Sequence, residues 1–141
     1  MKSIFSLIVL SLCFQGLVAQ NLNLDACDTL QTQKEINACI FKMYNVSQKK
    51  LDKAYGLFLK KLDNNIKSSK ASEVKRAQEL KQFYKEGQMQ WTLTRNLNAD
   101  TQGSFQLTKL LSEYAFYVSK TKESLDRIVY LEKLSDTLNL K

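Results

Sequence analysis

The chain has 141 residues, which suits one domain and is too short for two of ordinary size. It contains no histidine, no proline and only four glycines. His-dependent triads, imidazole bases and His-ligated zinc sites are therefore excluded, and long uninterrupted helices are permitted. Apolar residues at 44% and charged residues at 25% are typical of a globular protein, and the formal net charge of +7 makes it basic.

The first nineteen residues have the layout of a secretory signal peptide. Lys2 gives a positive start, an almost wholly apolar run covers residues 4–12, and the segment ends in the small residue Ala19. We expect cleavage after Ala19, which leaves a single domain of residues 20–141 in a periplasmic or secreted protein with no transmembrane segment. A membrane-spanning helix, the alternative, needs about 20 apolar residues. Lipid modification of Cys13 is a minor alternative, because the residue before it is bulky.

Cleavage leaves Cys27 and Cys39 as the two cysteines of the mature chain. An even pair in an exported protein is most simply a disulfide, and two free thiols are the alternative. If one helix contained both residues, their Cα atoms would lie about 18 Å apart, whereas a disulfide tolerates about 4.4 to 6.8 Å. The disulfide therefore requires that Cys27 precede the helix and fold back against its flank near Cys39.

Apolar residues at three- and four-residue steps predict an all-α fold, a small antiparallel bundle of three to four long helices stapled by the disulfide at its N-terminus. Thr32 and Glu35 form a capping box that places the first helix start near Gln33. The first stripe is interrupted at residues 45–48, which indicates one bent helix or two joined end to end. Its members are Ile36, Ile40, Met43, Leu51, Tyr55, Phe58, Leu62 and Ile66.

Two further stripes follow, separated by polar connections that we predict at residues 63–72 and 98–104. Ser72 is expected to cap the second helix, and residues 119–121 are expected to bend the third. The second stripe contains Val74, Ala77, Leu80, Phe83, Tyr84, Gly87, Trp91 and Leu97. The third contains Leu107, Leu110, Leu111, Tyr114, Val118, Leu125, Ile128 and Leu131.

Three short motifs carry a family resemblance. The first opens and closes with a cysteine, the second is a leucine followed four residues later by a tyrosine, and the third spaces Gln, Trp and Arg by three and four residues. Their residues are Cys27, Thr32, Gln33, Glu35, Asn37 and Cys39, then Leu51 and Tyr55, then Gln88, Trp91 and Arg95. This pattern resembles the LprI-type lysozyme-inhibitor family of small exported bacterial proteins. The resemblance implies a non-catalytic protein whose partner is a lysozyme.

The chain departs from the family pattern after Arg95. Family members commonly continue with an acidic residue and a third cysteine, which pairs with a fourth further on. Asn96 and Ala99 stand here instead, and no cysteine follows Cys39. We therefore expect packing alone to hold the last helix against the helix of Trp91.

The motif residues are expected to be mainly structural. Thr32 and Glu35 cap a helix, and Asn37, beside the polar Gln33, is expected to bond the turn at Cys27. Trp91 and Arg95 are one helical turn apart, so the guanidinium can lie over the indole inside the protein or meet a neighbouring carboxylate. An exposed Trp–Arg pair, the alternative, would be a good site for binding a protein partner.

Positive charge is concentrated in residues 41–95, where thirteen basic residues face five acidic ones and the net charge is +8. The basic residues gather near the first predicted connection. Such a cluster is either a solvated face or a surface for an anionic partner, such as phospholipid headgroups, acidic glycans or an acidic protein cleft. Nucleic acid is disfavoured as a partner because the chain carries an export signal.

We predict no catalytic residue, metal ligand or cofactor, and therefore no enzyme, because the acidic residues are scattered and no nucleophile or base is in place. The leading hypothesis is a periplasmic binding protein that occludes the active site of a lysozyme-type muramidase. Lys67, Lys70 or an exposed Arg95 would pair with the carboxylates of the cleft. A mature charge of +6, from 20 basic and 14 acidic residues, opposes binding to basic lysozymes. The alternative is an envelope-interaction or toxin-immunity module that binds an anionic envelope component or a cell-wall-degrading toxin.

Overall fold

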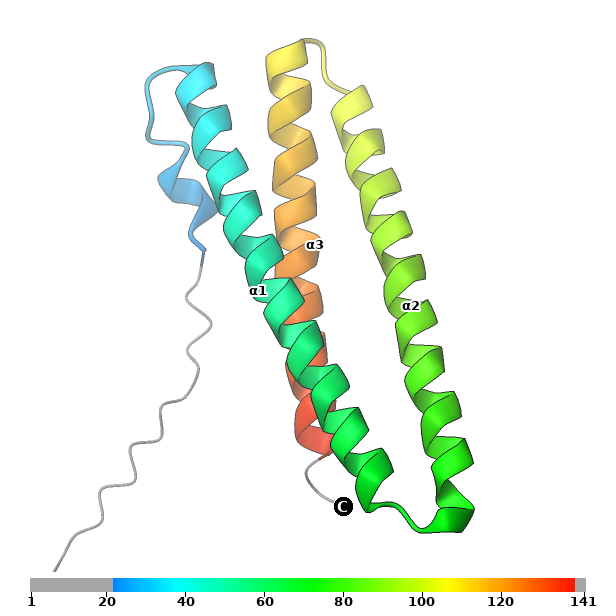
Figure 1. Cartoon of the computed structure of the whole chain (residues 1–141). Helices are drawn as coiled ribbons and strands as arrows, with labels where there is room; N and C mark the ends of the chain where they lie inside the picture. Colours follow the sequence, from blue (N-terminus) through cyan, green and yellow to red (C-terminus); the bar gives the residue numbers. More distant parts are fainter. Residues whose placement is uncertain (1–21, 139–141) are drawn as a thin grey trace, which may run out of the picture.

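The computed structural model describes residues 22–138. A short 3-10 helix, η1 (Leu24–Ala26), precedes three long helices, α1 (Gln33–Ser68), α2 (Ala71–Ser104) and α3 (Lys109–Thr137). Successive helices run antiparallel, and α3 lies beside both α1 and α2 (Figure 1). The predicted all-α bundle is confirmed. The predicted signal peptide and Cys13 lie outside the described residues, and none of the described helices combines the length and apolar character that spanning a membrane requires.

The N-terminal leader is fixed to α1 by the predicted disulfide. The Cα atoms of Cys27 and Cys39 are 5.7 Å apart, and Cys27 lies before α1 and is fully buried. At the start of α1 the Thr32 side chain accepts a hydrogen bond from the Glu35 backbone N–H, while the Glu35 carboxylate accepts one from the Thr32 backbone. This reciprocal pair satisfies two donors that the helix itself leaves unpaired. A folded-back leader and a firmly capped helix therefore form one end of the molecule.

Residues 45–48 do not interrupt α1, which is one continuous helix of 36 residues. Ser47 is buried, and its hydroxyl donates to the carbonyl of Tyr44. Gln48 donates to Ser124 of α3. The polar residues that break the apolar stripe are therefore contacts inside the bundle, and of the two alternatives the single helix is correct.

The first predicted connection is too long, and the second is misplaced. The first link is only residues 69–70, because residues 63–68 continue α1, and the hydroxyls of Ser68 and Ser69 donate to the Asn65 carbonyl at the end of that helix. The N-cap of α2 is Lys70, without a side-chain hydrogen bond, so the predicted cap at Ser72 is wrong. A polar run is compatible with helix wherever its residues face solvent, which is why composition alone misplaced this boundary.

The second link is residues 105–108, since α2 continues to Ser104. Within the predicted connection Gly103 is buried, and a Cβ atom at this position would lie 3.1 Å from the Ser112 Oγ and 3.2 Å from the Ser112 carbonyl oxygen of α3. Gly103 therefore permits the close approach of two helices rather than a turn. Thr108 caps α3, so Leu107, expected in the third stripe, is in the link and 97% exposed. No break occurs at residues 119–121, where the Thr121 hydroxyl donates to the Tyr117 carbonyl within α3.

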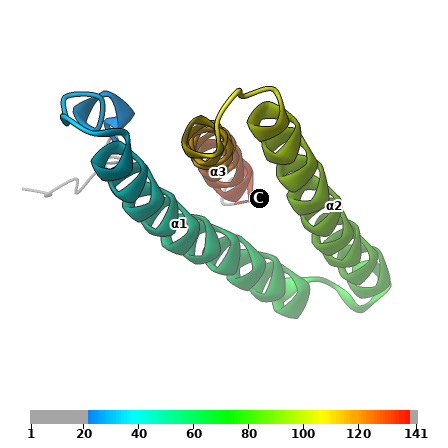
Figure 2. The same cartoon turned by 90° about the horizontal axis from the view of Figure 1, so that it is seen from above.

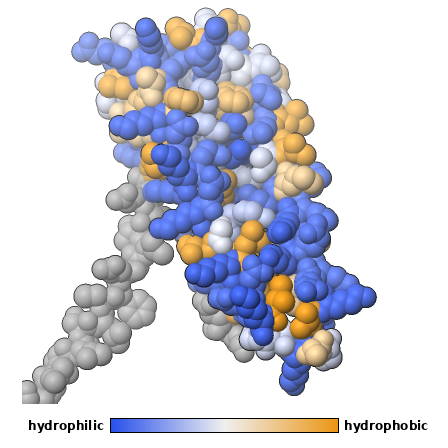
Figure 3. Space-filling view, viewed as in Figure 1, coloured by the Kyte–Doolittle hydropathy of each residue, from blue (hydrophilic) through white to orange (hydrophobic). Residues whose placement is uncertain are grey.

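The apolar core lies mainly between α1 and α3, and α2 covers its edge (Figure 2). Its buried residues are Leu51, Phe58, Leu62, Ile128 and Leu131. The ring of Tyr84 on α2 meets Phe58 edge to face, with 4.9 Å between centroids. Phe83 and Leu97, expected on the buried face of the second helix, are 68% and 67% exposed. Apolar side chains accordingly appear along the α2 side of the surface in Figure 3. The fully buried residues of α2 are polar or small, and a search for apolar stripes does not detect them, whereas Tyr84 and Trp91 of the predicted stripe do pack against the core.

Candidate functional site

A polar network at the centre of the bundle joins all three helices. The Arg95 Nη1 atom donates to Gln48 Oε1 of α1 at 2.9 Å and to Ser124 Oγ of α3 at 3.0 Å. Gln48 also donates to Ser124 at 2.8 Å, and the Ser124 hydroxyl donates to the Lys120 carbonyl at 2.6 Å. The Arg95 Nη1 atom, the Gln48 side-chain amide and the Ser124 hydroxyl thus all have partners inside the protein, as buried polar groups require. The network fixes the position of α2 where apolar packing is sparse.

Arg95 itself is 4% exposed, so it is not accessible to a partner, and the alternative of an exposed Trp–Arg pair does not describe it. Its Nε atom is buried and has no hydrogen-bond partner among the described residues. Burial lowers the pKa of the Arg95 guanidinium, while Tyr44, Glu123 and Asp52 oppose that shift. A buried cation with these neighbours has a structural role, because it holds helices together and offers no free face to a ligand.

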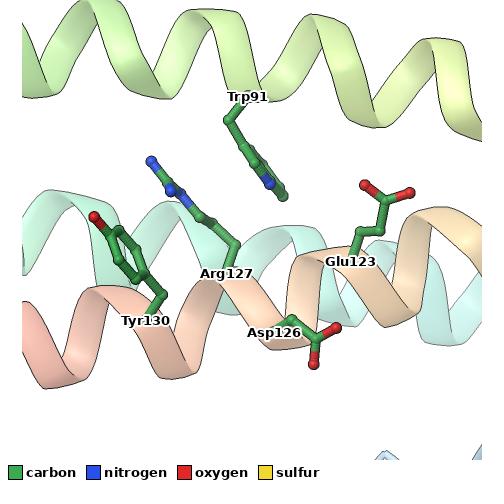
Figure 4. Close-up of a pocket in the computed structure, with 5 residues that line it drawn as sticks. All are labelled: Trp91, Glu123, Asp126, Arg127 and Tyr130. Atoms are coloured by element: carbon green, nitrogen blue, oxygen red, sulfur yellow. The ribbon is translucent and has the colours of Figure 1, made fainter.

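Trp91 lies between two arginines in the space where α2 faces α3. The guanidinium carbon of Arg95 is 5.1 Å from the Trp91 ring and that of Arg127 is 5.3 Å away. Arg127 also lies 4.6 Å from the Tyr130 ring and donates from Nε to Gln88 Oε1 at 2.9 Å. The third motif, Gln88–Trp91–Arg95, therefore forms the side of α2 that meets α3. A pocket of about 320 Å³ opens beside these rings (Figure 4).

The sequence did not indicate the roles of Gln48, Ser124 and Arg127, which complete these contacts. Arg127 directly precedes Ile128 of the third apolar stripe. This position at the border of a buried face could have indicated that the Arg127 side chain packs inward. Nothing in the sequence marked Gln48 and Ser124 as contacts between helices, apart from their positions within or beside such stripes. Their role depends on three helices meeting at one height, which only the structure shows.

The second motif lies in the apolar core, and the first lies at the end of the bundle where α1 begins. Leu51 is buried, and Tyr55, whose pKa is raised by burial against the opposing charges of Arg127 and Lys81, packs beside it. Asn37 does not bond the Cys27 turn as expected. Its side chain donates to the Leu110 carbonyl of α3 at 2.8 Å and accepts from Gln33, which ties the first turns of α1 to the start of α3.

The exposed basic residues Lys67 and Lys70 lie at the narrow turn between α1 and α2, at the opposite end of the molecule from the disulfide (Figure 1). Lys75 and Arg76 are exposed on the first turns of α2. We call Lys67, Lys70, Lys75 and Arg76 the basic tip. The nearby Lys61 and Lys81 are already engaged, with the Ser135 carbonyl and the Asp63 carboxylate respectively.

Within residues 22–138 no three His, Cys, Asp or Glu side chains are placed to hold a metal ion. The described side chains thus form three features. These are a buried hydrogen-bond network around Arg95, a pocket where α2 meets α3, and the exposed basic tip. These features define a disulfide-stapled three-helix protein with an internal scaffold and separate surface features. The chain belongs to the LprI family, because the family model described as "Lysozyme inhibitor LprI" matches residues 25–138, a range that includes the disulfide and all three long helices. No curated protein and no solved structure shows a significant match to this chain.

Proposed function

We propose that this protein is a non-catalytic exported inhibitor that binds a lysozyme-type muramidase and occludes its active-site cleft with the basic tip. Two facts support the proposal. The chain belongs to a family described as lysozyme inhibitors. The observation that carries the mechanism is the basic tip, where Lys67 and Lys70 project at the end of two helices of 36 and 34 residues joined by a two-residue link.

The tip is formed only by the ends of two helices and their two-residue link, and in the proposed complex it carries Lys67 and Lys70 into the cleft. Residues 67–76 contain four cations and one carboxylate, that of Glu73. The next acidic residues toward the core are Asp63 on α1, which is paired with Lys81, and Glu79 on α2. A glycosidase cleft holds a pair of carboxylates, and an ammonium group that meets a carboxylate away from bulk water forms a strong, charge-assisted hydrogen bond.

Export to the periplasm or the medium is part of the proposal. It rests on the signal-like residues 1–19, the expected single domain of residues 20–141, and a disulfide of the kind that persists in oxidising compartments. The motif residues act as scaffold in this account. The network around Arg95 and the cap at Thr32 hold the helices in place, and the tip makes the contact.

The proposal is tested by measuring the lysis of cell walls by a panel of muramidases, with and without the oxidised mature protein. Lys67→Glu combined with Lys70→Glu should raise the inhibition constant by about tenfold or more, since it replaces attraction to the cleft with repulsion. The matched control is Lys34→Glu with Lys109→Glu. It changes the net charge by the same amount on exposed residues at the opposite end of the bundle.

We expect the control pair to change the inhibition constant by less than about threefold, because charges on the remote end act only through the screened long-range field. No effect of the wild-type protein on any muramidase at micromolar concentration would reject inhibition. Equal losses for both variant pairs would instead favour the envelope-interaction alternative, in which the net positive charge matters more than its position. Attachment to isolated envelopes that disappears between low and physiological salt would support the same alternative.

A further inference from the structure

A shallow groove follows the seam between α2 and α3. It consists of two adjoining hollows, of about 550 Å³ and about 320 Å³, and Glu123 lines both. The groove extends from Tyr114, near the start of α3, to Tyr130, a separation of about 24 Å at a helical rise of about 1.5 Å per residue. None of the residues of the basic tip lines it. This α2–α3 groove is therefore a second surface feature, separate from the one proposed to bind the muramidase.

The lining of the groove mixes polar groups with apolar surface. Asn98 and Gln102 contribute amides from α2, and Thr101 and Ser119 contribute hydroxyls. Aromatic rings stand at both ends, with Tyr114 in the larger hollow and Trp91 and Tyr130 in the smaller one (Figure 4). The aliphatic lining side chains are those of Ala115 and Val118. A surface of this composition suits a ligand with many hydrogen-bonding groups and some apolar edges.

The charges that line the groove balance. Lys122 and Arg127 supply two cations, and Glu123 and Asp126 supply two carboxylates. A polyanion would meet repulsion from the carboxylates, and a polycation would meet it from the two basic residues. The balance favours a ligand with no net charge.

The smaller hollow is already organised for hydrogen bonding. Arg127 is held by the Gln88 side chain and by the rings of Trp91 and Tyr130, and within residues 22–138 its terminal Nη atoms donate to no acceptor. Among the same residues, the Glu123 carboxylate accepts two hydrogen bonds, from Asn98 and Ser119, and both are long at 3.4 Å. Because this donor is already fixed and this acceptor is weakly engaged, beside the partly exposed Trp91 and the exposed Tyr130, little ordering is needed when a ligand binds.

We infer that the α2–α3 groove binds a neutral oligosaccharide. The C–H faces of its sugar rings would lie on the rings of Tyr114 and Tyr130 at the two ends, with Trp91 beside them. Its hydroxyl groups would bridge the amides of Asn98 and Gln102, the carboxylate of Glu123 and the guanidinium of Arg127. An acidic polymer would match the length of the groove but not its balanced charge, and the test below distinguishes an oligosaccharide from a neutral extended peptide.

The test uses the fluorescence of Trp91, which is the single tryptophan of the chain and lines the smaller hollow. The oxidised mature protein is titrated, without any muramidase, with cellotetraose and with the tetramer of N-acetylglucosamine. Binding heats are measured by calorimetry in parallel. We expect a saturable change in Trp91 emission, and a matching heat signal, with at least one of these neutral tetrasaccharides.

Asn98→Ala combined with Gln102→Ala should weaken this binding by about tenfold, since each removes one side-chain hydrogen bond to the ligand. Both residues are exposed, so the fold should survive, and unchanged helical circular dichroism verifies this. The matched control is Gln78→Ala with Gln90→Ala, which removes two exposed amides of α2 that do not line the groove. The control should bind as the wild type does.

The inference is overturned if neither tetrasaccharide gives a saturable signal. It is also overturned if only a polyanion such as heparin or a neutral Gly-Ser peptide binds, or if the two double variants weaken binding equally. None of these outcomes bears on muramidase inhibition, because the charge reversals at Lys67 and Lys70 test that separately. Those reversals should leave oligosaccharide binding unchanged.

Discussion

Gln48 of α1 and Arg95 of α2 are 47 residues apart in sequence and are joined by a 2.9 Å hydrogen bond at the centre of the bundle. Ser124 of α3 bonds both of them. The apolar core lies mainly between α1 and α3, so this polar triangle is what ties the middle of α2 to both other helices. The orientation of α2, and with it the shape of the basic tip and of the α2–α3 groove, depends on this contact.

Replacing Arg95 should therefore destabilise the fold. Arg95→Ala removes the bonds to Gln48 and Ser124 and leaves a void beside Trp91, so we expect a loss of about 2 to 4 kcal/mol in the free energy of unfolding. Arg95→Met keeps much of the volume and removes a buried charge, so it should cost less than the alanine variant. Urea unfolding followed by circular dichroism measures both. An unchanged midpoint for Arg95→Ala would contradict the structural role given to the network.

The close approach of α2 and α3 at Gly103 predicts opposite outcomes for two glycines. Gly103→Val would place atoms against Ser112, at 3.1 Å and 3.2 Å already for Cβ, so we expect a destabilisation of about 1 to 3 kcal/mol. At Gly87, also within α2, a Cβ would meet nothing within 4 Å. Gly87→Val should leave stability unchanged or slightly raised, because valine has a better helix propensity than glycine. Thermal melts that show equal losses for the two variants would refute this packing.

The disulfide should account for a measurable part of the stability. It closes a loop with a sequence separation of 12 residues, and the restriction it places on the unfolded chain is worth about 3 kcal/mol. The double variant Cys27→Ser, Cys39→Ser should unfold at correspondingly lower urea concentration, while α2 and α3 keep their helical signal below the transition. A double variant with wild-type stability would show that the leader contributes nothing to the fold.

Two tyrosines predict a loss of stability at alkaline pH. Burial, followed by the hydrogen bond from its hydroxyl to Asp28, raises the pKa of Tyr114 above its ordinary value of 10.0, and burial also raises the pKa of Tyr55. The folded state therefore favours the neutral phenols. Their contribution is fully present below pH 10 and is lost as the pH rises through the higher folded-state pKa values.

Tyr114→Phe should reduce that alkaline loss, because one of the two phenols can no longer ionise. The measurement is the difference in unfolding free energy between pH 8 and pH 11 for the wild type and the variant. At pH 8 the variant should be slightly less stable, by about 1 kcal/mol or less, since the bond to Asp28 is missing. The same alkaline loss in both proteins would contradict the assigned shift.

Much of the fold was predictable from local chemistry. The spacing of Cys27 and Cys39 ruled out a single helix containing both, and the pair Thr32 and Glu35 marked the start of α1 to the residue. The helix ends at Ser68 and Ser104 were not predictable, because polar residues before a turn resemble polar residues on the exposed side of a helix. Only the neighbouring helix decides between these two cases.

The candidate sites were less predictable than the fold. Arg95 was recognised through its motif, yet its burial depends on Gln48 and Ser124, which lie 47 and 29 residues away. The buried residues of α2 are Arg95, Ala99 and Gly103, none of which is apolar and large. Hydrophobic periodicity correctly placed Tyr84 and Trp91 against the core, but it also placed Phe83 and Leu97 there, and these two are exposed. Lys67 and Lys70 were identified by charge, but their projection at the end of two long helices became evident only in three dimensions.

The most direct test of the account is to locate the contact between the tip and the muramidase. A photo-crosslinking amino acid at position 70, and in a matched protein at position 34, is activated in the presence of an inhibited muramidase. The products are then mapped by mass spectrometry. The account predicts crosslinks from position 70 to residues lining the catalytic cleft and few or none from position 34. Crosslinks from position 34 alone, or from position 70 only to surfaces outside the cleft while inhibition persists, would contradict it.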